Sequence, residues 1–147
     1  MIETLQTVLI VEDSIEDYQL TVRALEEAGL RNPLRRCGDG DEALDFLRHR
    51  GAYCDPASAP RPCAILLDLN LPGTDGRGVL QELKQDTDLR MIPVIILSTS
   101  TDDRDVNDCY GSGANSYVHK PVDLKAFFAA MQHLKDFWFE VAVLPRN

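Results

Sequence analysis

The residues that could do chemistry in this sequence stand directly after short apolar runs. Asp68 follows the run CAILL, and the acidic pair Glu12-Asp13 follows TVLIV. Ser98 follows PVIIL, and Lys120 comes two residues after SYV. A carboxylate without a partner is costly to remove from water. The position of Asp68 therefore indicates either a turn residue at the rim of a sheet or one part of a larger site.

Taken together, these residue types suit a divalent metal ion and a phosphoryl group. Mg²⁺ takes one or two carboxylates together with waters and phosphate oxygens. A lysine ammonium can bind a phosphoryl group as a point charge, and a serine hydroxyl can donate to its oxygens. Asp68 could then act as a nucleophile, because an aspartate can form an acyl phosphate. The metal ion and Lys120 would offset the repulsion between Asp68 and a phosphoryl donor.

The elements that must position these residues follow from the hydrophobic pattern. Short β-branched runs are typical of strands covered on both faces. Strands are predicted over residues 7–11, 63–67, 93–97 and 116–118, with an edge strand over 33–37 that begins at a proline. Helical periodicity is found over 15–29, 39–50, 76–85, 103–113 and 123–138. This alternation predicts an α/β fold, a doubly wound parallel sheet with helices on both faces.

In a doubly wound sheet, ligands bind beyond the carboxyl ends of the strands. Each polar residue has an ordinary interpretation by itself: Asp68 as a turn residue, Glu12-Asp13 as a helix N-cap region, Ser98 as a loop serine and Lys120 as a surface lysine. The joint pattern favours a site, because every strand end predicted near the centre of the sheet carries a matching group.

The composition limits the kind of protein this can be. The 147 residues suit one domain. The net charge of -9 argues against non-specific nucleic-acid binding, which needs basic side chains. The four cysteines contain no C-x-x-C pair, so a zinc site is not expected. The N-terminal segment becomes charged too early for a signal sequence, and no apolar run approaches ~18 residues. We therefore expect a cytoplasmic protein that does not bind membranes.

The order and spacing of the motifs resemble the receiver domain of two-component response regulators. The matching motifs are the acidic pair at 12–13, LLDLNLPGTDG (66–76), ILSTS (96–100) and YVHKP (117–121). The resemblance implies a flavodoxin-like (β/α)5 fold with strand order 2-1-3-4-5. The receiver domain would cover residues 1–135, followed by an apolar C-terminal extension over 136–147.

The resemblance also implies a role for each acidic residue. Asp68 would accept a phosphoryl group from a sensor histidine kinase in a Mg²⁺-dependent reaction. The carboxylates of Asp13 and Asp68 and the main-chain carbonyl of Asn70 would bind the ion, and Glu12 would bind it through a water. The chain would catalyse its own phosphoryl transfer and slow dephosphorylation without being a conventional enzyme.

The remaining motif residues would contact the phosphoryl group or respond to it. Ser98 and Lys120 would bind the phosphoryl oxygens, and Ser98 with Tyr117 would form the conformational switch. The Lys120-Pro121 bond is expected to be cis, a form found almost only before proline. Ser98 replaces the more usual threonine and keeps the hydroxyl, while Thr99 stands where a smaller residue is common.

Two features of the sequence resemble those of one group of response regulators within the family. The proline-containing loop over 51–62 is long, and the chain continues past the usual end with FWFEVAVLP over 137–145. Small response regulators that partner bacterial and cyanobacterial phytochrome kinases have a similar loop and tail. A phytochrome is therefore a candidate kinase.

Three classes of function compete for these residues. The leading one is a stand-alone phosphoacceptor that signals through protein contacts. A phosphohydrolase of the haloacid dehalogenase type also uses an aspartate nucleophile and magnesium, but it needs a second aspartate two residues on. Asn70 stands there and cannot act as an acid or base. A receiver-like adaptor that is never phosphorylated would usually lack part of the acidic site or the lysine, and both are present here.

Apolar residues are in surplus at the end of the chain. The last helix can be seated on the sheet by Leu124, Phe127, Phe128, Met131 and Leu134. Beyond it come Phe137, Trp138, Phe139, Val141, Val143 and Leu144. One helical face cannot bury all of these, and an exposed apolar patch often marks an interface. We expect a homodimer through the last helix and the tail; the alternative is a tail that folds back over its own domain.

Overall fold

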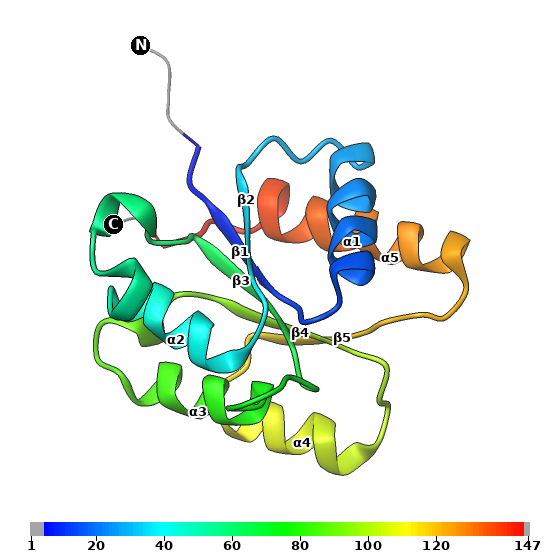
Figure 1. Cartoon of the computed structure of the whole chain (residues 1–147). Helices are drawn as coiled ribbons and strands as arrows, with labels where there is room; N and C mark the ends of the chain where they lie inside the picture. The colour runs from blue at the N-terminus through cyan, green and yellow to red at the C-terminus, as the bar shows by residue number, and fades with distance from the viewer. Residues whose placement is uncertain (1–4, 146–147) are drawn as a thin grey trace.

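The computed structural model describes residues 5–145 and contains one sheet of five parallel strands. The strand order β2-β1-β3-β4-β5 confirms the predicted topology (Figure 1). In chain order the strands are β1 (Val8–Val11), β2 (Leu34–Cys37), β3 (Ala64–Asp68), β4 (Val94–Ser98) and β5 (Ser116–His119). The predicted start of the receiver domain at residue 1 and the predicted end of the C-terminal extension at residue 147 lie outside the described residues.

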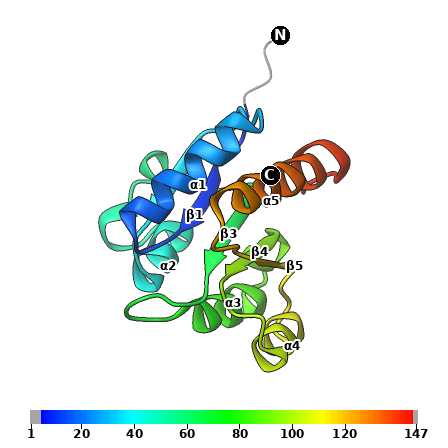
Figure 2. The same cartoon turned by 90° about the vertical axis from the view of Figure 1, so that its right-hand side faces the viewer.

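Helices cover both faces of the sheet, as predicted. Figures 1 and 2 show α1 and α5 together on one face, with α2, α3 and α4 on the other. The α-helices are α1 (Ile15–Glu27), α2 (Gly40–Arg48), α3 (Gly76–Gln85), α4 (Asp103–Gly111) and α5 (Leu124–Asp136), and a π-helix (Phe137–Val141) continues from α5. Short 3₁₀ helices lie at Gly51–Tyr53, Pro56–Ser58 and Leu89–Met91. No helix in the described part of the chain has the length and apolar character needed to cross a membrane.

The central strands are apolar on both faces because each face packs against helices. Val8 and Ile10 of β1 belong to the core under α1 and α5, whereas Leu9 and Val11 belong to the core under α2 and α3. This alternation follows from the two-residue period of a strand. The side chains of β1 are accordingly all buried.

Each α-helix begins with a side-chain cap at the edge of the sheet where the strands end. The caps are Ser14, Asp39, Asp75, Asp102 and Asp123, and each accepts a hydrogen bond from a main-chain N–H in the first turn. Such caps satisfy donors that the helix itself leaves unpaired. Each α-helix therefore begins at the same edge of the sheet, where the strands end.

Three strands, β3, β4 and β5, each extend one residue further than the hydrophobic pattern predicts. Asp68 is the last residue of β3 and Ser98 is the last residue of β4. Sheet pairing continues to Asp68, which lies opposite Leu97, and the Ser98 carbonyl accepts a hydrogen bond of 2.7 Å from the Lys120 N–H. The two side chains are therefore positioned by the sheet itself rather than by a loop.

Several hydrogen bonds hold the long loop between α2 and β3 against the domain, including those from Arg61 to Asp88 at 2.9 Å. Arg35 donates to the Ser58 carbonyl at 2.8 Å, His49 Nε2 lies 2.9 Å from the Ala59 carbonyl oxygen, and the Tyr53 hydroxyl donates to Glu42 at 2.6 Å.

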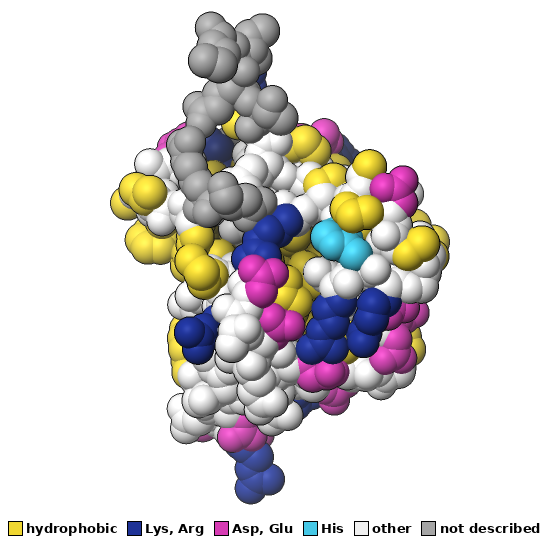
Figure 3. All heavy atoms as spheres, turned by 90° about the vertical axis from the view of Figure 1, so that its left-hand side faces the viewer, with side chains coloured by type: hydrophobic (Ala, Val, Ile, Leu, Met, Phe, Trp, Pro, Cys, Tyr) yellow, Lys and Arg dark blue, Asp and Glu magenta, His cyan; other side chains and the backbone are white. Residues whose placement is uncertain are grey.

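On the face shown in Figure 3, basic side chains lie beside acidic ones rather than in a patch of one sign. The expectation that the protein does not bind nucleic acid non-specifically still rests on its net charge of -9.

Candidate functional site

Three carboxylates meet at the carboxyl ends of the two central strands β1 and β3. Glu12 and Asp13 follow β1, and Asp68 ends the neighbouring β3. Each side chain offers an oxygen that lies within 4.8 Å of an oxygen from the other two. Glu12 is buried, Asp68 is half-buried and Asp13 is exposed. Like charges this close repel one another, and an all-oxygen donor set fits a hard divalent cation.

Lys120 brings a positive charge to the same cluster from the end of β5. Its Nζ donates to Glu12 Oε1 at 2.8 Å and lies 3.8 Å from Asp68 Oδ2. Burial raises the pKa of Glu12 to about 7, although Lys120 opposes this shift. Burial lowers the pKa of Lys120, but the hydrogen bond to Glu12 and the nearby carboxylates outweigh it, so the net shift is upward. The ammonium therefore stays charged beside Asp68.

Ser98 lies on β4, the strand next to Asp68. Its side chain is buried, and its Oγ accepts a hydrogen bond of 3.1 Å from the Ser100 N–H. This bond uses the oxygen as an acceptor, so the hydroxyl proton can still be donated. The structure thus brings Ser98 to the strand end beside the acidic cluster.

The turn after Asp68 holds the main chain next to the acidic cluster. The Asn70 N–H donates to Asp68 Oδ1 at 3.0 Å. The turn closes where the Gly76 N–H donates to the Leu69 carbonyl at 2.9 Å. A Cβ at Gly76 would lie 2.2 Å from the Asp68 carbonyl oxygen, so only glycine fits here. The main chain of Asn70 is therefore held close to Asp68, and the Asn70 side chain is exposed.

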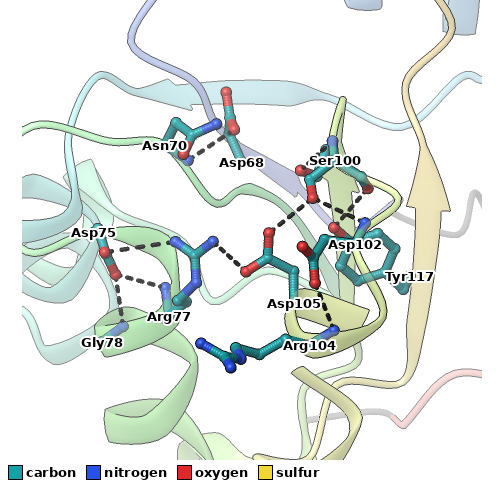
Figure 4. A network of polar contacts seen from close by, with 11 residues as sticks. Asp68, Asn70, Asp75, Arg77, Gly78, Ser100, Asp102, Arg104, Asp105 and Tyr117 are labelled. Carbon is teal, nitrogen blue, oxygen red and sulfur yellow. Dashed lines mark hydrogen bonds and ion pairs between the residues drawn. The ribbon is translucent and has the colours of Figure 1, made fainter. Parts of the chain in front are cut away.

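Tyr117 joins a polar network that links the loop after β4 to the helices α3 and α4 (Figure 4). Its hydroxyl donates to the Ser100 carbonyl at 2.9 Å. The Ser100 hydroxyl donates to Asp105 at 2.7 Å, and Asp105 also accepts from Arg77 at 2.7 Å. The motif reasoning gave Tyr117 but missed Arg77 and Asp105, because no local pattern marks these two charged residues as partners.

The Lys120-Pro121 bond is not cis, so this prediction is wrong: residues 5–145 contain no cis peptide bond. The trans form of an X–Pro bond is the lower in energy by about 0.5–1 kcal/mol. The Lys120 ammonium reaches Glu12 with the trans isomer in place.

The fold and the acidic cluster together define a class of protein. Residues 8–132 match the model of the response regulator receiver domain. The chain therefore belongs to this family, which is not a family of conventional enzymes.

Two individual proteins are similar to this chain over most of its length. The response regulator Rcp1 of Synechocystis sp. is 41% identical over 140 residues, which cover 95% of this chain and 93% of Rcp1. The probable methanogenesis regulatory protein FilR2 of Methanothrix harundinacea is 39% identical over 132 residues, which cover 89% of this chain and 82% of FilR2.

Two solved structures superpose on nearly the whole chain. The Mn(2+)-bound form of Rcp1 has a TM-score of 0.88 at 41% identity, covering 96% of this chain and 99% of that one. The phosphorylated cyanobacterial phytochrome response regulator RcpA has a TM-score of 0.90 at 38% identity, covering 97% of this chain and 100% of that one. The protein is thus a response regulator homologous to regulators of cyanobacterial phytochrome systems.

Proposed function

We propose that Asp68 accepts a phosphoryl group from a sensor histidine kinase. The observation that carries this is the position of Asp68 Oδ2, 3.8 Å from the Lys120 ammonium and next to two further carboxylates. An oxygen of Asp68 bonds to phosphorus as the bond from phosphorus to the kinase histidine nitrogen breaks, and the nitrogen keeps the electron pair. Lys120 and the Ser98 hydroxyl bind the phosphoryl oxygens. The chain catalyses this transfer and the later slow hydrolysis, in which a water oxygen bonds to phosphorus, inorganic phosphate leaves and the Asp68 carboxylate is restored.

We propose that Mg²⁺ binds at the acidic cluster. Asp13 and Asp68 would hold it through carboxylates, Asn70 through its main-chain carbonyl and Glu12 through a water. The three converging carboxylates support this, and so does the relative Rcp1, which was solved with Mn²⁺ bound. When bound, the ion neutralises negative charge on the phosphoryl group and on Asp68. Ser98 and Tyr117 would then report the phosphoryl group to the loop after β4.

The surface beside Lys120 supports a protein as the phosphoryl donor. Ile15, Val122 and Leu124 are large apolar side chains that lie 54%, 96% and 57% exposed. Val122 and Leu124 line a hollow between α1 and the β5–α5 connection, together with Thr99 and Lys120. Exposed apolar groups of this kind mark protein interaction sites. A kinase domain docked here would deliver its histidine next to Asp68, and the similarity to RcpA makes a phytochrome the proposed kinase.

We also propose a homodimer through α5 and the extension over residues 136–147, with the receiver domain over 1–135. Phe137, Val141 and Val143 are 52%, 69% and 95% exposed. Trp138, Phe139 and Leu144 instead pack against the core under α1 and α5. The tail is thus partly folded back, and its remaining apolar side chains are free for a second copy. The predicted cytoplasmic location stays a prediction.

The phosphoacceptor role is tested by intact mass after incubation with acetyl phosphate and Mg²⁺. The wild-type chain should gain one phosphoryl group, and Asp68→Asn should gain none because its amide is not a nucleophile. Asp103→Asn is the matched control, since it removes the same charge from an exposed position on α4. A full adduct on Asp68→Asn would show that another residue is the acceptor.

A wild-type chain that takes up no phosphoryl group, either from acetyl phosphate or from any sensor kinase of its source, would instead support the adaptor function. Steady release of phosphate from small phosphate esters would support a phosphohydrolase, which the asparagine at position 70 disfavours.

A further inference from the structure

We propose that Arg36 is a positioning residue for the metal site. Its guanidinium fixes the main chain of Glu12 and Asp13, so that both carboxylates face Asp68. This role rests on the proposed function of the acidic cluster as a divalent cation site. Nothing in the sequence motifs pointed to Arg36, which lies on the edge strand β2.

The contacts of Arg36 are made to the acidic pair itself. Its Nε donates to the Glu12 carbonyl at 3.0 Å, and its Nη2 donates to the Asp13 carbonyl at 3.0 Å. The Glu12 N–H in turn donates to the Cys37 carbonyl at 3.0 Å. The rigid planar fork of arginine suits two neighbouring acceptors. The strand β2 thus holds the acidic pair at three main-chain atoms.

These bonds matter because the acidic pair lies between two regular elements. The strand β1 ends at Val11 and the cap of α1 is Ser14, so neither element fixes the carbonyls of the two residues between them. In the sheet, β1 lies between β2 and β3. The carbonyls are held from the β2 side, while the carboxylates meet Asp68 of β3 on the other side. Loss of the guanidinium would release both carbonyls and let the Asp13 carboxylate turn away, whereas the Glu12 carboxylate is also held by Lys120 and by the Ser14 N–H.

Arg36 is itself held in place by its surroundings. The centre of its guanidinium lies 5.9 Å from the centre of the Tyr18 ring on α1, within the range of a cation–π contact. A Cβ at Gly38 would lie 3.0 Å from Nη2, so a glycine there leaves room for the fork. The contact with the Tyr18 ring thus favours the orientation in which the guanidinium reaches both carbonyls.

The neighbouring Arg35 provides a matched comparison. It carries the same charge on the same strand, but its guanidinium donates to the Ser58 carbonyl and lies 5.5 Å from the centre of the Phe46 ring. Substitution of either arginine by methionine removes one positive charge and keeps most of the apolar stem. Only substitution at position 36 removes contacts to the acidic pair.

A purely electrostatic role and a positioning role predict opposite results. A positive charge near the acidic cluster repels a metal ion, so removing the charge alone would strengthen metal binding. Removing a group that orients the ligands weakens it, typically by about 10- to 100-fold for residues that support a metal site from outside. Metal affinity therefore separates the two roles by its direction of change.

The experiment is a calorimetric titration of the full chain with Mg²⁺, repeated with Mn²⁺ by following the electron paramagnetic resonance of the free ion. Arg36→Met should weaken binding about 10-fold, and Arg35→Met should change it less than about 2-fold. Arg36→Lys keeps the charge but cannot offer two parallel donors, so its affinity should lie between wild type and Arg36→Met. Urea denaturation confirms that each variant is folded under the titration conditions.

Equal or tighter metal binding by Arg36→Met would overturn the positioning role, as would an equal loss in Arg35→Met. If Arg36→Met does not fold, Arg36→Lys carries the test, and wild-type affinity in that variant would overturn the role. Asp13→Ala separates this inference from the proposed function. If Asp13→Ala loses metal binding and Arg36→Met does not, only the role of Arg36 fails; if Asp13→Ala binds as wild type does, the metal site and the role of Arg36 both fail.

Discussion

Glu12 has the most unusual environment among the site residues. Its side chain is buried, and its carboxyl group lies beside the ammonium of Lys120 and the carboxyl group of Asp68. Burial raises the pKa of Glu12 to about 7 from the ordinary value of 4.5, and the ammonium of Lys120 limits the shift. The cluster therefore holds a proton at mildly acidic pH that a free glutamate would have released.

This shift predicts that the metal-free protein loses stability as the pH rises. Between pH 4.5 and about 7 the folded state binds more protons at Glu12 than the unfolded state does, so the free energy of unfolding falls with pH. The stabilisation from the proton on Glu12 is fully present below pH 4.5, the pKa in the unfolded chain. It is lost as the pH rises through about 7, the pKa in the folded protein. It amounts to at most roughly 3 kcal/mol, at 1.36 kcal/mol per pKa unit.

The measurement is urea denaturation of the wild type and of Glu12→Gln at pH 5 and pH 8, with a chelator present. The amide of Glu12→Gln does not titrate, so the difference between the two proteins isolates the effect of Glu12 on the pH dependence of stability. The wild type should lose more stability than Glu12→Gln between the two pH values. The same loss in both proteins would mean that Glu12 has an ordinary pKa.

At the scale of elements, Lys84 ties helix α3 to the start of β4 and β5. Its Nζ donates to the carbonyls of Arg90 and Ile92, both at 3.0 Å, and to Asn115 Oδ1 at 3.1 Å. The same Asn115 oxygen accepts from the Val94 N–H at 2.8 Å. Lys84 is half-buried, and this burial lowers the pKa of its ammonium.

Lys84→Met should destabilise the fold by about 1–3 kcal/mol, because it leaves acceptors without a donor while it keeps the apolar stem. Lys125→Met, at an exposed position in α5, is the control and should have little effect. Urea denaturation at neutral pH measures both. If the two variants were equally stable, the junction of α3, β4 and β5 would not depend on the ammonium.

At the scale of the molecule, the dimer can be tested without disturbing the core. Truncation after Lys135 would remove Trp138 and Leu144, which pack against the domain. Val141→Asp combined with Val143→Asp changes only exposed side chains and places charge in the proposed interface. Sedimentation should show a dimer for the wild type and a monomer for the double variant.

Val122→Asp is the control for the dimer, since it places the same charge on a side chain that is 96% exposed in the connection before α5. It should sediment as the wild type does. A monomeric wild type at micromolar concentration, with and without phosphorylation, would exclude the dimer. A dimeric double variant would show that the tail is not the interface.

The sequence alone was enough for the features that depend on local pattern. Short apolar runs gave the five strands, the polar residues after them gave the rim where Glu12, Asp68 and Lys120 meet, and the order of the motifs gave the family. These features are readable because a strand covered on both faces must be apolar, whereas its end must not be.

Only the tertiary structure decided which side chains support the site and how they are charged. Arg36 and Lys84 act through carbonyl oxygens, and a carbonyl leaves no mark in the sequence because every residue has one. The pKa of Glu12 depends on how deeply the cluster is buried, and the trans bond at Lys120-Pro121 also departs from the family pattern. The burial of Glu12 depends on packing between segments far apart in the chain, which no local pattern encodes.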